Sequence, residues 1–269
     1  MSDDLVPDDL WERIAPLLPP QPERRRRHSG RLRVPDRVAL AGIVYVLRKG
    51  VAWRDVPAGL VGCSGVTAWR RLRDWTEAGV WPRLHTELLV ELRNTGLLEM
   101  DDCAIDGSHV RALKRGDHVG PSPVDRARPG SKHHLIVDRR GTPLAVSVTG
   151  GNRHDVTQLI PLLDAIPRIR GLRGRQRSKP KRLFADRGYD YDKYRRLLRK
   201  RGIKPLIARR GVAHGSGLGK TRWVVERTFA WLHQFKRLRI RYEHRADLHQ
   251  GLLELACSII CLRRLRTSF

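Results

Sequence analysis

The apolar residues of this chain change their spacing at about residue 100. Before that point they recur every three or four positions, as in amphipathic helices. Beyond it, short apolar runs of strand length alternate with helical stretches. The pattern predicts two parts: an all-α part over residues 1–99 and an α/β part over residues 100–269.

The first part has the outline of a DNA-binding helical module. Ser64 stands at the expected N-cap of a helix over residues 65–78, and Arg70, Arg71 and Arg73 lie off its apolar side. A helix, a turn and a basic helix make a helix-turn-helix, although any helical bundle gives a similar outline. We expect these three arginines to contact DNA. The predicted helices cover residues 8–18, 35–49, 65–78 and 80–95.

In the second part, the predicted elements follow the order strand, hairpin, helix, strand, helix, strand, helix, with one more helix at the end. This is the order of the ribonuclease H-like fold, an α/β fold whose mixed sheet is flanked by helices. In that fold the first strand is central and the fourth lies beside it, so residues at their carboxyl ends come close together. The predicted elements are 103–105, 133–138, 143–148, 154–166, 181–185, 190–201, 204–208, 222–236 and 247–265.

The charge of the chain favours a polyanionic partner. Lys and Arg number 54 against 28 Asp and Glu, which gives a net charge of +26. Most of the excess, +23, lies on residues 101–269. Nucleic acid is the first candidate partner, and a solvated arginine-rich surface is the alternative. A basic segment at 24–28 is a candidate DNA-contacting arm.

The chain has no apolar run of about eighteen residues, so we expect no membrane span. Its acidic N-terminus lacks a signal-peptide pattern. The four cysteines lack zinc-ligand spacing, and Cys257 and Cys261 are spaced for packing within an apolar helix. We therefore expect a cytoplasmic, reduced protein associated with the bacterial nucleoid.

Three acidic residues stand out against the basic background. Asp106 and Asp186 each follow a predicted strand, and Glu226 lies among apolar residues of a predicted helix. Three neighbouring carboxylates repel one another unless a cation neutralises them. Two Mg²⁺ ions about 3.5–4 Å apart, held by such carboxylates, catalyse phosphodiester chemistry. Arg222 shares the helix face of Glu226 and could contact a DNA phosphate.

Each acid also has a plainer interpretation. An Asp after a strand often starts a turn or caps a helix, and Arg222 with Glu226 could be an ordinary helix ion pair. Other acids compete for the metal role: Asp138, Asp190 and Asp192 fit turns or caps. Asp155, beside His154, is the strongest competitor.

Several stretches together resemble the DDE transposases of bacterial insertion sequences, closest to the group typified by insertion sequence five. Asp186 and Glu226 are separated by 39 residues, a spacing typical of that superfamily. The matching stretches are Trp53–Pro57, Gly79–Trp81, Ile105–Ser108, Asp125–Arg126, Gly130–His133, Ala185–Asp190 and Arg222–Arg227.

The resemblance implies that Asp106, Asp186 and Glu226 are catalytic and bind two Mg²⁺ ions per site, with Mn²⁺ as a substitute. It also implies an N-terminal module that reads terminal inverted repeats, double-stranded DNA ends and targets as partners, and a homodimer or higher oligomer on DNA. Lys132, Arg187 and Arg222 lie inside the matching stretches and are expected to contact DNA.

The chain departs from the family at two places near Glu226. Relatives often carry a Tyr and a Lys where this chain has Gly219 and His233, and Lys236 is a candidate replacement for the Lys. Two other functions stay open: a catalytically inactive DNA-binding protein derived from a transposase, and a nuclease that cleaves without joining.

Overall fold

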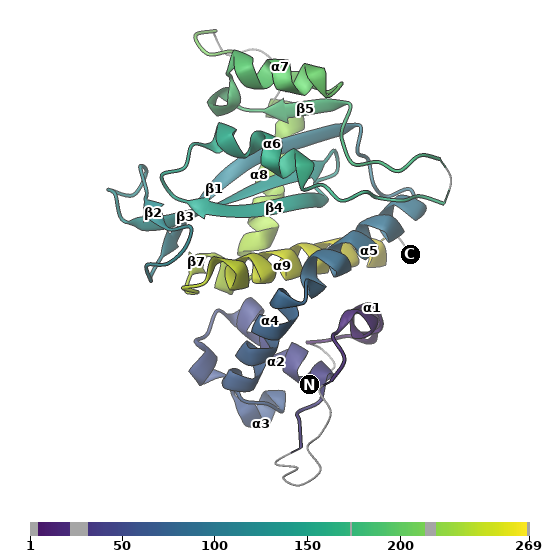
Figure 1. Cartoon of the computed structure of the whole chain (residues 1–269), viewed down its shortest axis with the longest axis vertical. Coiled ribbons are helices and arrows are strands. Elements are labelled where there is room, and N and C mark those ends of the chain that lie inside the picture. Colours follow the sequence, from purple (N-terminus) through teal and green to yellow (C-terminus); the bar gives the residue numbers. More distant parts are fainter. Residues whose placement is uncertain (1–4, 22–31, 173, 213–218, 268–269) are drawn as a thin grey trace.

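The computed structural model describes residues 5–21, 32–172, 174–212 and 219–267. Helices α1 to α4 gather at one end of the molecule and the sheet at the other, with α5 (Val80–Asn94) and α9 (Ala246–Arg266) between them (Figure 1). The basic segment at 24–28 lies outside the described residues.

The predicted N-terminal helices are confirmed. Ser64 caps α4 as expected, because its hydroxyl accepts a hydrogen bond from the backbone N–H of Thr67 at 3.3 Å. Short 3₁₀ turns, η1 (Ala15–Leu17) and η2 (Trp53–Asp55), join the helices. The helices are α1 (Asp8–Ile14), α2 (Asp36–Lys49), α3 (Ala58–Val61), α4 (Gly65–Glu77) and α5 (Val80–Asn94).

The sheet has the ribonuclease H-like topology that the element order predicts. Strand β1 is central: it pairs antiparallel with β3 on one side and parallel with β5 on the other. Strand β4 pairs antiparallel with β3, and β6 pairs parallel with β5 at the edge. The strands are β1 (Asp102–Ala112), β2 (Gly120–Pro121), β3 (Pro129–Asp138), β4 (Pro143–Gly150), β5 (Arg182–Ala185), β6 (Lys204–Ile207) and β7 (Ile240–Arg241).

Strand β1 is longer than predicted, so Asp106 lies in its middle and not at its end. The antiparallel ladder with β3 runs without a break from Cys103↔Asp138 to Arg111↔Gly130. Pairing with β3 provides hydrogen-bond partners for the backbone of the second half of β1, which is polar and has no apolar run of its own. The prediction of a strand over 103–105 was therefore wrong in length.

Helices cover both faces of the sheet. In Figure 1, α6 crosses the front of the sheet and α8 passes behind it. The remaining helices and 3₁₀ turns are η3 (Asp155–Gln158), α6 (Leu159–Asp164), η4 (Arg187–Tyr189), α7 (Asp192–Lys200), α8 (Gly219–His233) and η5 (Lys236–Leu238). No helix within the described residues is both long and apolar enough to cross a membrane.

The N-terminal helices pack closely against α9. Gly251 of α9 makes this approach possible, because a Cβ there would lie 2.8 Å from Thr76 Oγ1 and 2.9 Å from Trp81 Cδ1. Buried apolar side chains from both parts form one continuous cluster. The boundary at residues 99/100 therefore remains a prediction, since the core crosses it.

A buried histidine at this junction should make stability depend on pH. His85 of α5 is 6% exposed, and its Nε2 lies 2.9 Å from the Pro143 carbonyl oxygen. Burial lowers the pKa of His85 to about 4, and the hydrogen bond to Pro143 offsets only part of that effect. Because the folded pKa lies below the unfolded value of about 6.5, the unfolded state binds the proton first as pH falls.

We therefore expect His85 to have no effect on the pH dependence of stability above about pH 6.5. Between about pH 6.5 and 4 it should lower the free energy of unfolding by about 1.4 kcal/mol per pH unit. Urea denaturation at pH 7 and pH 5 measures this change. The His85→Gln variant should lose less stability between the two pH values than the wild type, and an equal loss would contradict this account.

Candidate active site

The register between β1 and β5 places two of the predicted acids side by side. Ala104 of β1 pairs with Phe184 of β5 in the parallel ladder. Asp106 and Asp186 each follow two residues later, just beyond the last paired positions. Both carboxylates therefore lie where the pairing of β1 with β5 ends, beyond the C-terminal end of β5, although β1 itself continues along β3.

Arg222 joins Asp106 to Glu226. Its Nη1 lies 3.2 Å from Asp106 Oδ2, and its Nη2 lies 3.1 Å from Glu226 Oε1. Arg222 and Glu226 are one turn apart on α8, so the two side chains share a helix face. One guanidinium thus neutralises carboxylates from two elements that are distant in the sequence.

The electrostatics of Asp106 show that its carboxyl group lies within the influence of the other two acids. The pKa of Asp106 is raised to about 6, chiefly by burial and also by the negative charges of Asp186 and Glu226, against the opposing effects of the Gly107 N–H and Arg222. Asp106 Oδ1 accepts the Gly107 N–H at 2.8 Å. A cation bound near Asp106 would stabilise the ionised form of this carboxyl group.

Asp186 has a local partner of its own. One of its oxygens accepts the Gly188 N–H at 2.8 Å and caps η4. The cap interpretation of this Asp is thus correct, and its second oxygen has no hydrogen bond to any of the described residues. Arg222 thus joins Asp106 and Glu226, and the charge of Asp186 raises the pKa of Asp106. A common metal site of the three acids stays a prediction.

The donor set fits a hard divalent cation. Carboxylate oxygens are the ligands that Mg²⁺ takes, and burial together with the charges of Asp186 and Glu226 raises the pKa of Asp106 here. Across the described residues, no three His, Cys, Asp or Glu side chains are arranged to hold a metal ion. Arg222 pairs with two of the acids, and one oxygen of Asp186 accepts the Gly188 N–H.

Tyr189 is a site residue that sequence reasoning missed. Its side chain is 1% exposed, and its hydroxyl has no hydrogen-bond partner among the described residues. Burial raises the pKa of Tyr189 well above its usual range, and the charges of Asp106, Asp155 and Asp186 add to the effect. The only sequence signal was its place in the stretch that follows Asp186.

Asp155, the strongest competitor for the metal role, lies close to the site, because a Cβ on Gly107 would lie 2.7 Å from Asp155 Oδ1, but it is paired with a lysine. Its carboxylate lies 3.0 Å from Lys132 Nζ, and Lys132 also donates to the Arg153 carbonyl oxygen at 2.9 Å. The Lys132 side chain is 6% exposed. Lys132 therefore ties η3 to β3, and we withdraw it from the expected DNA contacts.

Arg71, another predicted DNA contact, is buried in an ion pair within the chain. It is buried and its Nε lies 2.9 Å from Asp36 Oδ1, so it fastens α4 to α2. Arg70 is exposed on the same helix, and Arg73 pairs with Asp74 at 2.8 Å. These two remain candidates, because both reach the surface.

Two further candidates lie against other parts of the chain. Arg187 is half-buried and donates to the Val212 carbonyl oxygen at 2.6 Å. Lys236, the candidate replacement for the family lysine, lies at the junction with the N-terminal helices, where a Cβ on Gly50 would meet the Cβ of Lys236 at 2.9 Å.

Two family models match this chain. The model described as "Transposase DDE domain" matches residues 98–261, and a model for transposases of the IS4/5 family matches residues 6–85. The chain belongs to the DDE transposase family. Membership implies DNA as the partner, DNA cleavage and strand transfer as the activity, and the use of divalent metal ions.

Individual relatives agree with this assignment. The transposase assigned to insertion sequence element IS402 of Burkholderia cepacia is 63% identical over 148 residues, which cover 55% of this chain and 70% of that relative. A 16.2 kDa protein of the same element is 49% identical over 124 residues, which cover 46% of this chain and 84% of the relative.

A solved structure, the pre-cleavage Mos1 transpososome, aligns with 90% of this chain and 81% of its own chain. The TM-score is 0.27 at 11% sequence identity, so we draw nothing from this likeness.

Proposed function

We propose that this DDE transposase binds the terminal inverted repeats of an insertion sequence, cleaves the element ends and joins them to target DNA with Mg²⁺. Asp106, Asp186 and Glu226 would hold two metal ions, with Mn²⁺ as a substitute. The observation that supports this most directly is that Asp106 and Asp186 both lie two residues beyond the β1–β5 ladder, and that the charges of Asp186 and Glu226 raise the pKa of Asp106. We infer a cytoplasmic, nucleoid-associated protein that works as a homodimer or higher oligomer on paired ends.

When bound, the metal ions would activate the attacking oxygen and neutralise the charge of the phosphoryl group. Arg222 holds Asp106 and Glu226 in place before DNA arrives. Once metal ions neutralise these carboxylates, the Arg222 guanidinium would be able to pair with a DNA phosphate beside the site. Charge-assisted hydrogen bonds favour such a pair. The Asp186 cap fixes the start of η4, so that its second oxygen keeps one direction.

An assay of end joining tests the proposal. The purified protein is incubated with a labelled duplex that carries the terminal repeat of its own element and with a target plasmid, in Mg²⁺ or in EDTA. Joining of the label to the plasmid only in Mg²⁺ is the expected result. Binding without cleavage would support the inactive DNA-binding protein, and cleavage without joining would support the nuclease.

The basic surface also predicts binding that weakens steeply with salt. The logarithm of the association constant should fall linearly with the logarithm of the salt concentration, with a slope of about −0.9 for each phosphate neutralised. Arg70 is exposed on α4, so Arg70→Gln should make the slope shallower by about one such unit. Fluorescence anisotropy across a salt series measures it. A wild-type slope near zero would contradict a surface that follows the DNA backbone.

A further inference from the structure

Tyr189 of η4 carries a hydroxyl that is buried in the protein. The side chain is 1% exposed, and the hydroxyl has no hydrogen-bond partner among the described residues. Buried polar groups are nearly always hydrogen-bonded, because removing them from water without a new partner is unfavourable. A phenylalanine would fill the same space without this penalty. The hydroxyl therefore calls for an acceptor that is supplied when the protein works.

The turn that carries Tyr189 also carries a proposed metal ligand. Asp186 caps η4 by accepting the Gly188 N–H at 2.8 Å, and the Tyr189 N–H donates to the Asp186 carbonyl oxygen at 3.2 Å. The Tyr189 carbonyl oxygen in turn accepts the Tyr191 N–H at 3.0 Å. The backbone of Tyr189 is thus fixed with respect to Asp186.

The surroundings of the hydroxyl are acidic. Burial raises the pKa of Tyr189 well above its usual range, and the charge of Asp106 has the largest effect among the charges that raise it further. The charges of Asp155 and Asp186 follow, and Arg222 acts in the opposite sense. The hydroxyl therefore stays protonated at neutral pH, as a hydrogen-bond donor in a neighbourhood of carboxylate acceptors.

Two of these three acids are poor acceptors for this donor. Lys132 Nζ lies 3.0 Å from Asp155 Oδ1, so that carboxylate already has a charged partner. Asp186 belongs to the turn that carries Tyr189, and the aromatic ring places the hydroxyl away from the backbone of this turn. Asp106, on the neighbouring strand β1, is the remaining acceptor.

Arg222 now occupies the oxygen of Asp106 that a new donor would need. Asp106 Oδ1 accepts the Gly107 N–H at 2.8 Å, and Arg222 Nη1 lies 3.2 Å from Oδ2. A divalent cation that binds this carboxylate takes over the charge neutralisation that Arg222 provides. Carboxylates that ligate metal ions are themselves hydrogen-bonded, and these outer partners fix the direction of the ligand.

We propose that Tyr189 is a positioning residue of the metal site, whose hydroxyl donates to the Asp106 carboxylate when a divalent cation binds there. The proposal rests on the metal-dependent function proposed above. Arg222 holds the carboxylate before the cation arrives, and Tyr189 holds it afterwards. Because the Tyr189 backbone is fixed by the turn that Asp186 caps, the hydroxyl also sets the direction of Asp106 relative to Asp186.

The Tyr189→Phe variant tests the proposal, because it removes the hydroxyl and keeps the ring. Mn²⁺, which takes the same oxygen ligands as Mg²⁺, is titrated into the full-length protein, free and on a terminal-repeat duplex. Electron paramagnetic resonance measures the binding from the falling signal of the free ion. Losing an outer partner should weaken Mn²⁺ binding about 10–100-fold. Tyr191→Phe removes a hydroxyl that lies 3.0 Å from His154 Nε2, and should keep the wild-type affinity.

Urea denaturation separates positioning from packing. In EDTA, Tyr189→Phe should keep the wild-type midpoint or raise it, because the variant loses a buried hydroxyl without a partner. Added Mn²⁺ should raise the midpoint of the variant less than that of the wild type. Wild-type Mn²⁺ affinity in Tyr189→Phe would overturn the role of Tyr189, and a lowered midpoint in EDTA would assign the hydroxyl to packing instead. A wild type that binds Mn²⁺ no better than Asp186→Asn, free and on DNA, would contradict the proposed metal site, and this role with it.

Discussion

Replacing Asp186 by Asn should abolish cleavage and joining of element ends, with a loss of at least about a thousandfold. The amide has nearly the same shape and its oxygen can still accept the Gly188 N–H, so the cap on η4 should survive. What it lacks is the negative charge that a divalent cation requires. Asp106→Asn and Glu226→Gln should behave in the same way, and combining them should add little, because the three residues act as a unit.

Asp192 offers a matched control for this series. It lies on α7, its side chain is 79% exposed, and it contacts Arg209 at 3.3 Å. Asp192→Asn should therefore keep wild-type cleavage in the same gel assay. Cleavage by the Asp186→Asn variant at more than about a tenth of the wild-type rate would exclude Asp186 from the metal site.

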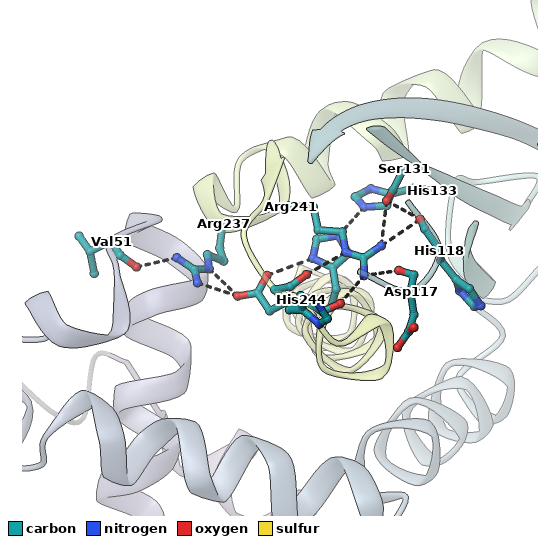
Figure 2. Close-up of polar contacts among 10 residues, drawn as sticks. Val51, Asp117, His118, Ser131, His133, Arg237, Arg241 and His244 are labelled. Atoms are coloured by element: carbon teal, nitrogen blue, oxygen red, sulfur yellow. Dashed lines mark hydrogen bonds and ion pairs between the residues drawn. The ribbon is translucent and has the colours of Figure 1, made fainter. Parts of the chain in front are cut away.

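Glu243→Gln should lower the free energy of unfolding by about 3–5 kcal/mol, because it leaves a buried guanidinium without its counter-charge. The side chains of Arg237 and Glu243 are 4% and 2% exposed. Glu243 Oε2 also lies 3.3 Å from His249 Nδ1, whose Nε2 in turn lies 2.8 Å from His133 Nε2 on β3. The pair thus sits in a buried chain that runs from the sheet to the N-terminal helices (Figure 2).

Urea denaturation at pH 7 measures this loss, and Asp247→Asn is its control. Asp247 pairs with Arg245 where both side chains are well exposed, 46% and 39%, so its loss should cost less than about 1 kcal/mol. A Glu243→Gln variant within about 1 kcal/mol of the wild type would contradict the assigned role of the buried pair.

The pKa of Glu243 adds a pH dependence with a defined sign. Burial alone would raise this pKa, but the hydrogen bond with His249 and the charge of Arg237 hold it at about 2. Because the folded pKa is below the unfolded value of about 4.5, the stabilisation is complete above pH 4.5. It is lost as pH falls from about 4.5 towards 2, which is a lower window than that of His85.

The hairpin of β3 and β4 and the edge position of β6 were predicted from local apolar runs and turn signals. The pairing of β1 with β5 was predicted from the order of the elements, and the two-residue strands β2 and β7 were not predicted. The convergence of Asp106 and Asp186 followed from topology alone. The length of β1 could not be predicted, because pairing with β3, and not its own composition, makes its second half a strand.

The roles of individual cations were harder to predict. Arg71 and Lys132 looked like solvent-facing DNA contacts, but each is buried against an acid far away in the sequence, Asp36 and Asp155. The sequence position of a basic residue does not reveal an acidic partner 20 or more residues away. Whether the residue is buried decides between a DNA contact and an ion pair within the chain. Tyr189 was missed for the same reason. Only the folded chain shows that its hydroxyl is buried without a hydrogen-bond partner among the described residues.

The most direct test of the central claim, that these carboxylates bind the metal ions, is a change of metal preference. In the Asp186→Cys variant a thiolate replaces a carboxylate, and thiolate favours softer ions than Mg²⁺. End cleavage by this variant should be lost in Mg²⁺ and at least partly restored in Mn²⁺, while the wild type works in both. Equal cleavage by the variant in Mg²⁺ and in Mn²⁺ would show that the side chain at position 186 does not bind the metal.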